Sequence, residues 1–168
     1  KNPVSLKPDV QLGLILDEIV SELQFKAESK GIYLKLGKIK KDLKINADRE
    51  KLKAALFNVV DNSIKYTPKG GVDVKVENDV SVKIIVSDTG IGISPEKIKT
   101  LFDTQFGRDE QAKEVSAMGS GIGLYLATQI IKAHNGKIWA ESPARRSLGA
   151  GGEGEGKGST FYVELPIG

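Results

Sequence analysis

The stretch NVVDNSIKYT, residues 58–67, decides how this chain folds. It has the apolar pattern of a helix, but polar residues interrupt that pattern. Val59, Val60 and Ile64 recur at the spacing of a helix that buries one face. Asn58 and Asn62 break this apolar stretch one helical turn apart, although asparagine is a mediocre helix former. Such a helix either has a solvated edge with incidental amides or uses the amide oxygens as ligands.

Lys65 and Tyr66 follow on the next turn of the same side of this helix. Two neutral amide oxygens beside one ammonium suit a hard cation together with phosphate, because magnesium takes oxygen ligands and usually shares them with a nucleotide's phosphates. Lysine contributes to phosphate binding as a point charge. The spacing alone does not decide between this site and a solvated helix edge.

The composition is typical of one globular domain. The chain has 168 residues, of which 39% are hydrophobic and 28% charged, and this length is sufficient to bury a core. The net charge of +3 is too small to argue for nucleic acid as a partner. No apolar run approaches the roughly 18 residues of a membrane helix, and the absence of cysteine fits a reducing cytoplasm. Because the chain begins at Lys1 without a signal peptide, we expect a piece of a longer protein.

Apolar periodicity predicts alternating helices and strands. The expected elements are a helix from Pro8 to about Gly31, a strand at 32–36, a helix capped by Asp48 and ended by Pro68, a β-hairpin at 72–86, a short helix at 94–102, a helix at 124–134, and strands at 138–141 and 159–165. This order predicts an α/β fold, in which helices cover one face of a single mixed or antiparallel sheet.

The stretch VSDTGIGIS, residues 86–94, ends the second strand of the hairpin. Asp88 shares the parity of Val86 on that strand, so its carboxylate should point toward the core side. A buried carboxylate must accept hydrogen bonds, and it could accept them from an exocyclic amino group. Gly90 and Gly92 remove side chains where a flat ligand could approach the backbone. The alternative is an ordinary Asp-Thr-Gly turn after a strand.

A second glycine-rich stretch, GSGIGLYLATQII at residues 119–131, leads into a helix. Its alternating glycines expose backbone N–H groups at the helix N-terminus, where an anion is favoured. It is not the dinucleotide-binding fingerprint, because the glycine spacing differs and no strand precedes it. The similar-looking GGEGEGKGST, residues 151–160, is no P-loop, because Gly158 stands where Ser or Thr is required and a strand follows.

Taken in order, these motifs resemble one family. NVVDNSIKYT is similar to its asparagine box, DTGIGI to its first glycine box, LFDTQFGR to its phenylalanine box and GSGIGL to its second glycine box, with IIKAHNGKIWAES and GKGSTFYVELP as flanking signatures. The family is that of the catalytic ATP-binding domains of bacterial sensor histidine kinases, which share the GHKL or Bergerat fold with gyrase and MutL. The resemblance covers nearly the whole chain, from about Leu6 to Pro166.

The resemblance implies a fold and a division of the chain. The fold is an α/β two-layer sandwich with a mixed sheet of about five strands, helices on one face and a flexible ATP lid. Residues 1–8 would be a linker from an absent helical domain, residues 9–168 the catalytic domain and residues 93–120 approximately its lid.

The resemblance also implies cofactors, ATP and Mg²⁺, and a set of site residues. Magnesium would be coordinated by Asn62, with Asn58 beside it, directly or through water. The phosphates would be held by Lys65, Arg108 and the segment Gly119, Ser120, Gly121, Ile122, Gly123 and Leu124. The nucleotide base would meet Tyr66, Asp88, Gly90, Gly92 and Ile93, and either Ser159 or Thr160. Asn58, Lys65 and Arg108 are the expected catalytic residues.

Asn58 stands where hydrolytic relatives carry the glutamate that activates water. Because an amide is not a useful base at neutral pH, this implies phosphoryl transfer to a nucleophile. His134 matches a histidine common within this domain and is not the acceptor. The expected partners are a histidine-bearing dimerisation domain of the same parent and a response regulator receiver domain, with no nucleic acid, no direct membrane contact and a monomeric chain. One alternative is a gyrase-like or chaperone-like ATPase. The other is a binding module, either a degenerate ATP domain or a regulator of the anti-sigma type.

Overall fold

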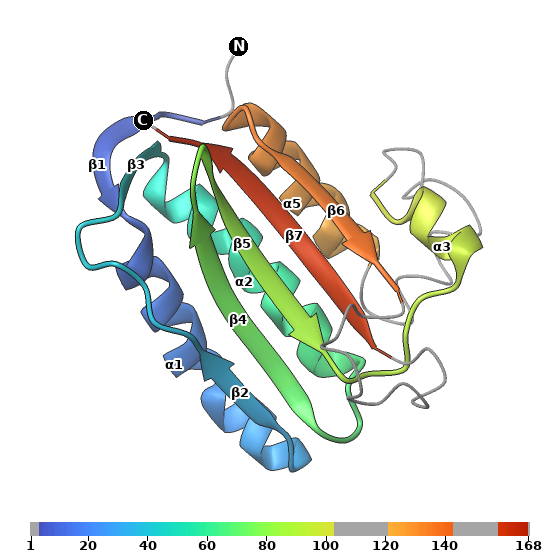
Figure 1. The fold of residues 1–168 in the computed structure, drawn as a ribbon. Coiled ribbons are helices and arrows are strands. Elements are labelled where there is room, and N and C mark those ends of the chain that lie inside the picture. The colour runs from blue at the N-terminus through green and yellow to red at the C-terminus, as the bar shows by residue number, and fades with distance from the viewer. Residues whose placement is uncertain (1–3, 103–120, 143–157, 168) are drawn as a thin grey trace.

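The computed structural model describes residues 4–102, 121–142 and 158–167. Its elements, in chain order, are β1 (Lys7–Gln11), α1 (Leu12–Lys30), β2 (Tyr33–Leu36), β3 (Lys44–Ala47), α2 (Arg49–Lys65), β4 (Gly71–Asn78), β5 (Ser81–Asp88), α3 (Pro95–Thr100), α5 (Gly121–Ala133), β6 (Lys137–Glu141) and β7 (Ser159–Pro166) (Figure 1).

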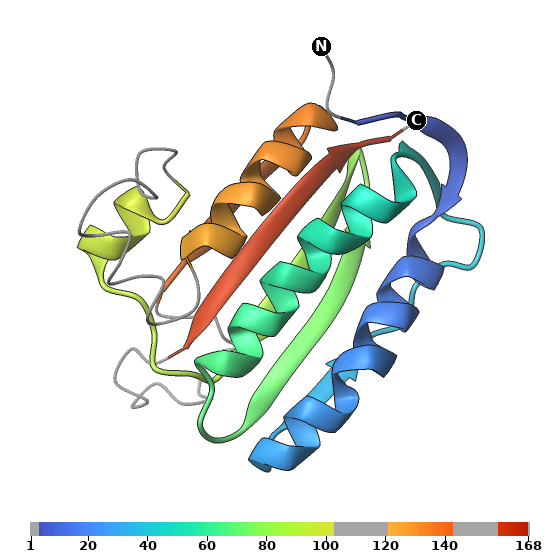
Figure 2. The ribbon, with the colours of Figure 1, turned by 180° about the vertical axis from the view of Figure 1, so that it is seen from behind.

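Five of the strands form one mixed sheet in the order β2-β4-β5-β7-β6. The β2–β4 pair is parallel, and the other pairs are antiparallel. The helices α1, α2 and α5 cover one face of this sheet, with α2 in the middle (Figure 2). The predicted two-layer α/β fold with a mixed five-stranded sheet is therefore confirmed.

The hydrophobic core lies between the sheet and the helices. The opening stretch forms the second half of α2, whose Val59, Val60 and Ile64 are at most 1% exposed. Val72, Val74, Val82, Ile84, Val86 and Val163 meet the helices from the sheet. Within the described ranges, none of the helices is both long and apolar enough to cross a bilayer.

The start of the chain differs from the prediction. Helix α1 begins at Leu12 instead of Pro8, because Lys7–Gln11 is a strand that pairs antiparallel with β3 in a separate two-stranded sheet. Both strands were missed because they are short, and the register of β1 shifts between Lys7 and Val10, which removes the alternation that signals a strand. The linker boundary at residue 8 stays a prediction, although Val4 is already buried.

Other element boundaries are close to those predicted. Helix α5 begins at Gly121 instead of Leu124. The short helix α3 is capped as expected, because the Ser94 hydroxyl accepts a hydrogen bond from the Lys97 backbone N–H. The predicted lid spans residues 93–120, of which 103–120 lie outside the described residues.

The N-cap of α2 joins three parts of the chain. The Asp48 carboxylate accepts hydrogen bonds from the backbone N–H groups of Lys51, at 3.3 Å, and of Ser5, at 2.9 Å. The Asp48 N–H donates to Nε2 of the buried His134 at 3.0 Å. The other ring nitrogen, Nδ1, lies 2.9 Å from the Ile130 carbonyl oxygen, to which it donates as the protonated nitrogen of the neutral ring. The start of α2 is thus tied to α5 and to the segment before β1.

Replacing Asp48 should therefore destabilise the fold in a pH-dependent way. Asp48→Ala removes the cap and the acceptor for Ser5, and we expect a loss of about 1–2 kcal/mol in the free energy of unfolding at pH 7. The hydrogen bond from Ser5 is the main cause that holds the Asp48 pKa below its usual value of 3.8. This contribution is present above pH 3.8 and disappears as the pH falls through the lowered pKa.

Urea denaturation of both proteins at pH 7 and at pH 3 measures this difference, with the exposed loop variant Asp42→Ala as the control. A destabilisation by Asp48→Ala that is the same at both pH values, or no larger than that of the control, would contradict the assignment.

Candidate functional site

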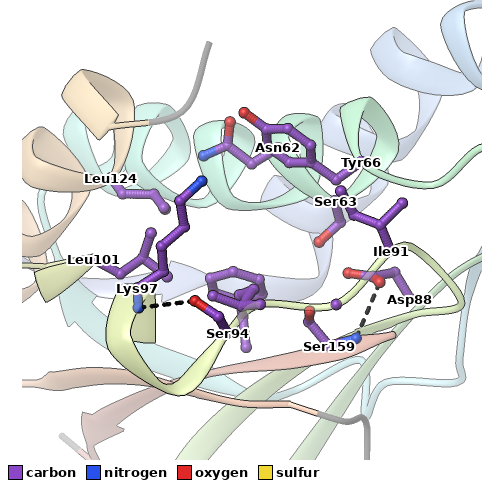
Figure 3. A pocket seen from close by; sticks show the side chains of 13 residues that line it. Asn62, Ser63, Tyr66, Asp88, Ile91, Ser94, Lys97, Leu101, Leu124 and Ser159 are labelled. Atoms are coloured by element: carbon purple, nitrogen blue, oxygen red, sulfur yellow. Dashed lines mark hydrogen bonds between the residues drawn. The ribbon is translucent and has the colours of Figure 1, made fainter. Parts of the chain in front are cut away.

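A cavity of about 230 Å³ opens between α2, the segment from β5 to α3, and the start of β7 (Figure 3). Its lining combines a few polar side chains with apolar walls, which is typical of a small-molecule site. The lining residues are Asn62, Ser63, Tyr66, Asp88, Ile91, Gly92, Ile93, Ser94, Lys97, Leu101, Leu124, Ser159 and Phe161.

Asp88 is the buried anion of this cavity. Its residue is 4% exposed at the end of β5, on the core side together with Val86, as its strand parity predicts. Its Oδ1 accepts hydrogen bonds from the N–H groups of Gly90, at 2.8 Å, and Ser159, at 3.1 Å. The pairing of β5 with β7 brings Asp88 and Ser159 opposite each other. Two backbone donors offset the cost of burying the carboxylate.

Two buried polar atoms of the cavity have no hydrogen-bond partner among the described residues. They are the amide Nδ2 of Asn62 and the hydroxyl oxygen of Ser63, on consecutive residues of α2. In Figure 3 the Ser63 hydroxyl points into the cavity on the Asp88 side, and Asn62 lies at its upper rim beside Tyr66. Because buried polar groups are almost always paired, these atoms indicate that the cavity receives a polar ligand or ordered water.

Apart from Tyr66, Ser94, Lys97 and Ser159, the remaining lining residues are apolar. Ile91 is 58% exposed although it is a large aliphatic residue, and Leu101, Leu124 and Phe161 are buried at the walls. Phe161 also packs edge-on against Phe102, with ring centroids 6.2 Å apart. Apolar walls around a single carboxylate suit a flat ring that carries a hydrogen-bond donor.

Glycine is required at positions 90 and 92, after Asp88, for two different physical reasons. Gly92 lines the cavity with a left-handed backbone, at φ 84°. Gly90 is not a lining residue: a Cβ built there would lie 2.1 Å from the Tyr66 carbonyl oxygen. That carbonyl accepts the Ile91 N–H at 3.0 Å. Gly90 thus leaves room for the end of α2, and its contact with a ligand stays a prediction.

Several predicted residues line the cavity together: Asn62, Tyr66, Asp88, Gly92, Ile93, Leu124 and Ser159. Asn58 instead lines a separate surface hollow with Glu22, Glu50 and Lys53. Lys65 is also outside the lining, and its ammonium lies 3.8 Å from the Asp61 carboxylate. The cavity therefore does not contain all of the predicted site residues.

Ser159 and Thr160, the two alternatives at the start of β7, have different surroundings. Ser159 lines the cavity, whereas the Thr160 hydroxyl lies 3.2 Å from that of Ser87 on the neighbouring strand. Arg108, Gly119 and Ser120 lie outside the described residues. Gly121, Ile122 and Gly123 form the first turn of α5.

The sequence interpretation missed six lining residues: Ser63, Ile91, Ser94, Lys97, Leu101 and Phe161. Ser63 was detectable, because it neighbours Asn62 and adds a hydroxyl to an apolar helix face. Leu101 and Phe161 follow the pattern of core residues, and Lys97 follows that of a solvated helix surface. Only the tertiary arrangement places these three at one cavity.

Comparisons with known proteins show the family of this chain. Residues 47–168 match the family model described as "Histidine kinase-, DNA gyrase B-, and HSP90-like ATPase". The adaptive-response sensory kinase SasA of Synechococcus sp. (strain JA-2-3B'a(2-13)) is 36% identical over 165 residues, which cover 95% of this chain and 39% of SasA. The chain thus spans well under half of that relative.

Solved structures show the same relationship. The nucleotide-free catalytic domain of histidine kinase ThkA superimposes with a TM-score of 0.76 at 25% identity, over 97% of this chain and 98% of that domain. Full-length ShkA in complex with AMPPNP gives a TM-score of 0.73 at 25% identity, over 97% of this chain and 31% of ShkA. The chain therefore belongs to the histidine kinase-, DNA gyrase B- and HSP90-like ATPase family, and it has the fold of a sensor histidine kinase catalytic domain.

Proposed function

We propose that this chain is the catalytic domain of a two-component sensor histidine kinase, which binds ATP with Mg²⁺ and transfers the γ-phosphoryl group to a histidine on a separate dimerisation domain. The observation that carries the proposal is the cavity beside α2, where a buried carboxylate and two polar atoms without a partner among the described residues meet apolar walls. The bound AMPPNP in full-length ShkA supports ATP as the nucleotide.

Asp88 is the proposed acceptor for the exocyclic amino group of adenine. Its Oδ1 is already oriented by the N–H groups of Gly90 and Ser159, so the carboxylate is held in place before any ligand arrives. A carboxylate can only accept hydrogen bonds, and it therefore favours adenine over guanine, whose corresponding position is a carbonyl oxygen. The walls formed by Ile91, Gly92 and Ile93 would contact the ring.

Asn62 is the proposed magnesium ligand, and its environment fits this role. Its side-chain amide is buried at the cavity, and its Nδ2 has no partner in the part of the chain that the structure describes. The oxygen and nitrogen of an amide exchange places when the group turns over. Among the described residues no cluster of three acidic, histidine or cysteine side chains could hold a metal. The metal would therefore share the amide oxygen with nucleotide phosphates and, when bound, would neutralise the charge of the transferred group.

Asn58 and Lys65 would act at the phosphate end. Both lie on α2, one turn before and one turn after Asn62, and Asn58 would reach the metal directly or through water. Since an amide is a poor general base, Asn58 leaves α2 without a group that activates water at this position, and this favours transfer to an external nucleophile. Tyr66 would pack beside the nucleotide, and Arg108 with residues 119–124 would complete the phosphate contacts.

The partners follow from this function. The phosphoacceptor histidine would lie on a dimerisation domain of the same parent, because His134 is buried in structural hydrogen bonds. The receiver domain of a response regulator would take the phosphoryl group next. The solved complex of histidine kinase ThkA, which has the same fold, with the response regulator protein TrrA supports this partner. We propose a cytoplasmic, monomeric domain that binds neither nucleic acid nor membrane.

Phosphoryl transfer in trans tests the function. The chain is mixed with a separately produced helical dimerisation domain, Mg²⁺ and γ-labelled ATP, and we expect label on the histidine of that domain. Steady phosphate release by the chain alone would favour the ATPase alternative. A folded chain that shows no heat on titration with Mg-ATP would favour a binding module.

The role of Asp88 predicts a change in base preference. In Asp88→Asn the side-chain oxygen still accepts from Gly90 and Ser159, but the carboxylate's second oxygen is replaced by an NH₂ donor that faces the adenine amino group. We expect ATP affinity to fall at least about tenfold, in line with about 1.5 kcal/mol for a lost charge-assisted hydrogen bond, and the preference for ATP over GTP to shrink.

Calorimetric titration with ATP and with GTP measures this preference, and Asp79→Asn in the hairpin turn is the matched control. An Asp88→Asn protein with an unaltered ratio of ATP to GTP affinity would refute the contact.

The role of Asn62 predicts a loss of metal dependence. Asn62→Ala removes the amide but no apolar contact of the core, so we expect an intact fold and ATP affinity that no longer increases when Mg²⁺ is added. Titrations with Mg²⁺ and with EDTA measure this, with Asn46→Ala on β3 as the control. If the variant retains the full increase with Mg²⁺, the metal has been misplaced.

A further inference from the structure

We propose that Lys97 is a nucleotide-binding residue, whose ammonium group binds the polyphosphate from the wall of the cavity opposite α2. The inference rests on the proposed nucleotide function and adds a contact from α3 to those from α2. Lys97 lines the cavity together with Asn62 and Asp88. Figure 3 shows its side chain extending from α3 across the cavity toward Asn62.

The described part of the lining has one positively and one negatively charged side chain, and they lie at opposite sides of the cavity (Figure 3). Lys97 and Asp88 are the two charged residues among the lining residues, and every other described member is neutral. A ligand that donates a hydrogen bond at one end and is anionic at the other fits this arrangement in one orientation only. A nucleotide with its base at Asp88 places its phosphates toward Lys97.

The neighbourhood of the Lys97 ammonium supports an anion. The ammonium points toward the Asn62 amide (Figure 3), whose Nδ2 has no partner within residues 4–102, 121–142 and 158–167 and could donate a second hydrogen bond to the anion. Apolar walls nearby, formed by Leu101 and Leu124, lower the local dielectric and strengthen the attraction between an ammonium and a phosphate. The same Asn62 turned over would present its oxygen to a phosphate-bound metal.

Lys97 is carried by an anchored segment. The Ser94 hydroxyl caps α3 by accepting the Lys97 N–H at 3.2 Å, and Leu101 at the other end of α3 is 8% exposed in the core. Before α3, the Ile93 N–H donates to the Ser142 hydroxyl at 2.8 Å, and this hydroxyl donates to the Gly158 carbonyl at 2.8 Å. These contacts fix the wall relative to β6 and β7, so the lysine starts from a defined position.

The neighbouring lysine offers a matched control. Lys99 lies on the same short helix, is exposed, and is not a lining residue. Removing either ammonium changes the net charge of the chain by the same amount. A general attraction between α3 and polyphosphate would therefore be weakened equally by both substitutions, whereas a direct contact depends on Lys97 alone.

The test is calorimetric titration of adenosine, ADP and ATP, with Mg²⁺ present, into the wild-type chain and the variants Lys97→Met, Lys97→Arg and Lys99→Met. For Lys97→Met we expect ADP and ATP affinity to fall about tenfold and adenosine affinity to stay unchanged, as for one lost charge-assisted hydrogen bond. Lys97→Arg should retain most of the affinity, and Lys99→Met should bind all three ligands as the wild type does.

The outcomes separate this inference from the function on which it rests. Wild-type ATP affinity in Lys97→Met, equal losses in Lys97→Met and Lys99→Met, or an equal loss for adenosine would overturn the lysine contact while leaving the ATP site in place. A wild-type chain that binds adenosine but gains nothing from the phosphates would overturn it as well. A wild-type chain that binds none of the three ligands would overturn the proposed function and the inference together.

Discussion

The structure of the site depends on one buried carboxylate. Asp88 ends β5, and its Oδ1 holds the backbone of Gly90 after that strand and of Ser159 at the start of β7. These hydrogen bonds fix the turn from which Ile91, Gly92 and Ile93 reach the cavity. A buried charge is stable only when hydrogen bonds or an opposite charge compensate for the loss of water around it. The requirement that stabilises Asp88 therefore also determines the shape of the base end of the cavity.

Helix α2 connects this end to the rest of the molecule. Its first turn is tied through Asp48 to Ser5 and His134, and the Tyr66 carbonyl at its end accepts the Ile91 N–H beside Gly90. One face of α2 packs in the core, while the same helix presents Asn62 and Ser63 to the cavity. Burying a polar atom without a hydrogen-bond partner destabilises the fold. A helix that is held at both ends can tolerate this loss, because packing in the surrounding core offsets it.

Much of this was predictable from local sequence, and the remainder depends on tertiary contacts. The period of α2, the Asp48 cap and the parity of Asp88 are local signals, and all three are confirmed. Strands β1 and β3 were missed because each exists only through pairing with the other. Lys97 was missed for a related reason, because the sequence does not show which of the exposed lysines lies at the cavity.

The location of the nucleotide is the central claim, and NMR titration of the ¹⁵N-labelled chain with Mg-ATP tests it most directly. If adenine binds Asp88, the amide signals of Gly90 and Ser159, which donate to that carboxylate, should shift together with those of Asn62 and Ser63. A further hollow lies between the start of α1 and the segment after β2, and Gly37 and Lys41 are among its lining residues. Unchanged signals of the four amides, together with shifts at Gly37 and Lys41, would contradict nucleotide binding at Asp88.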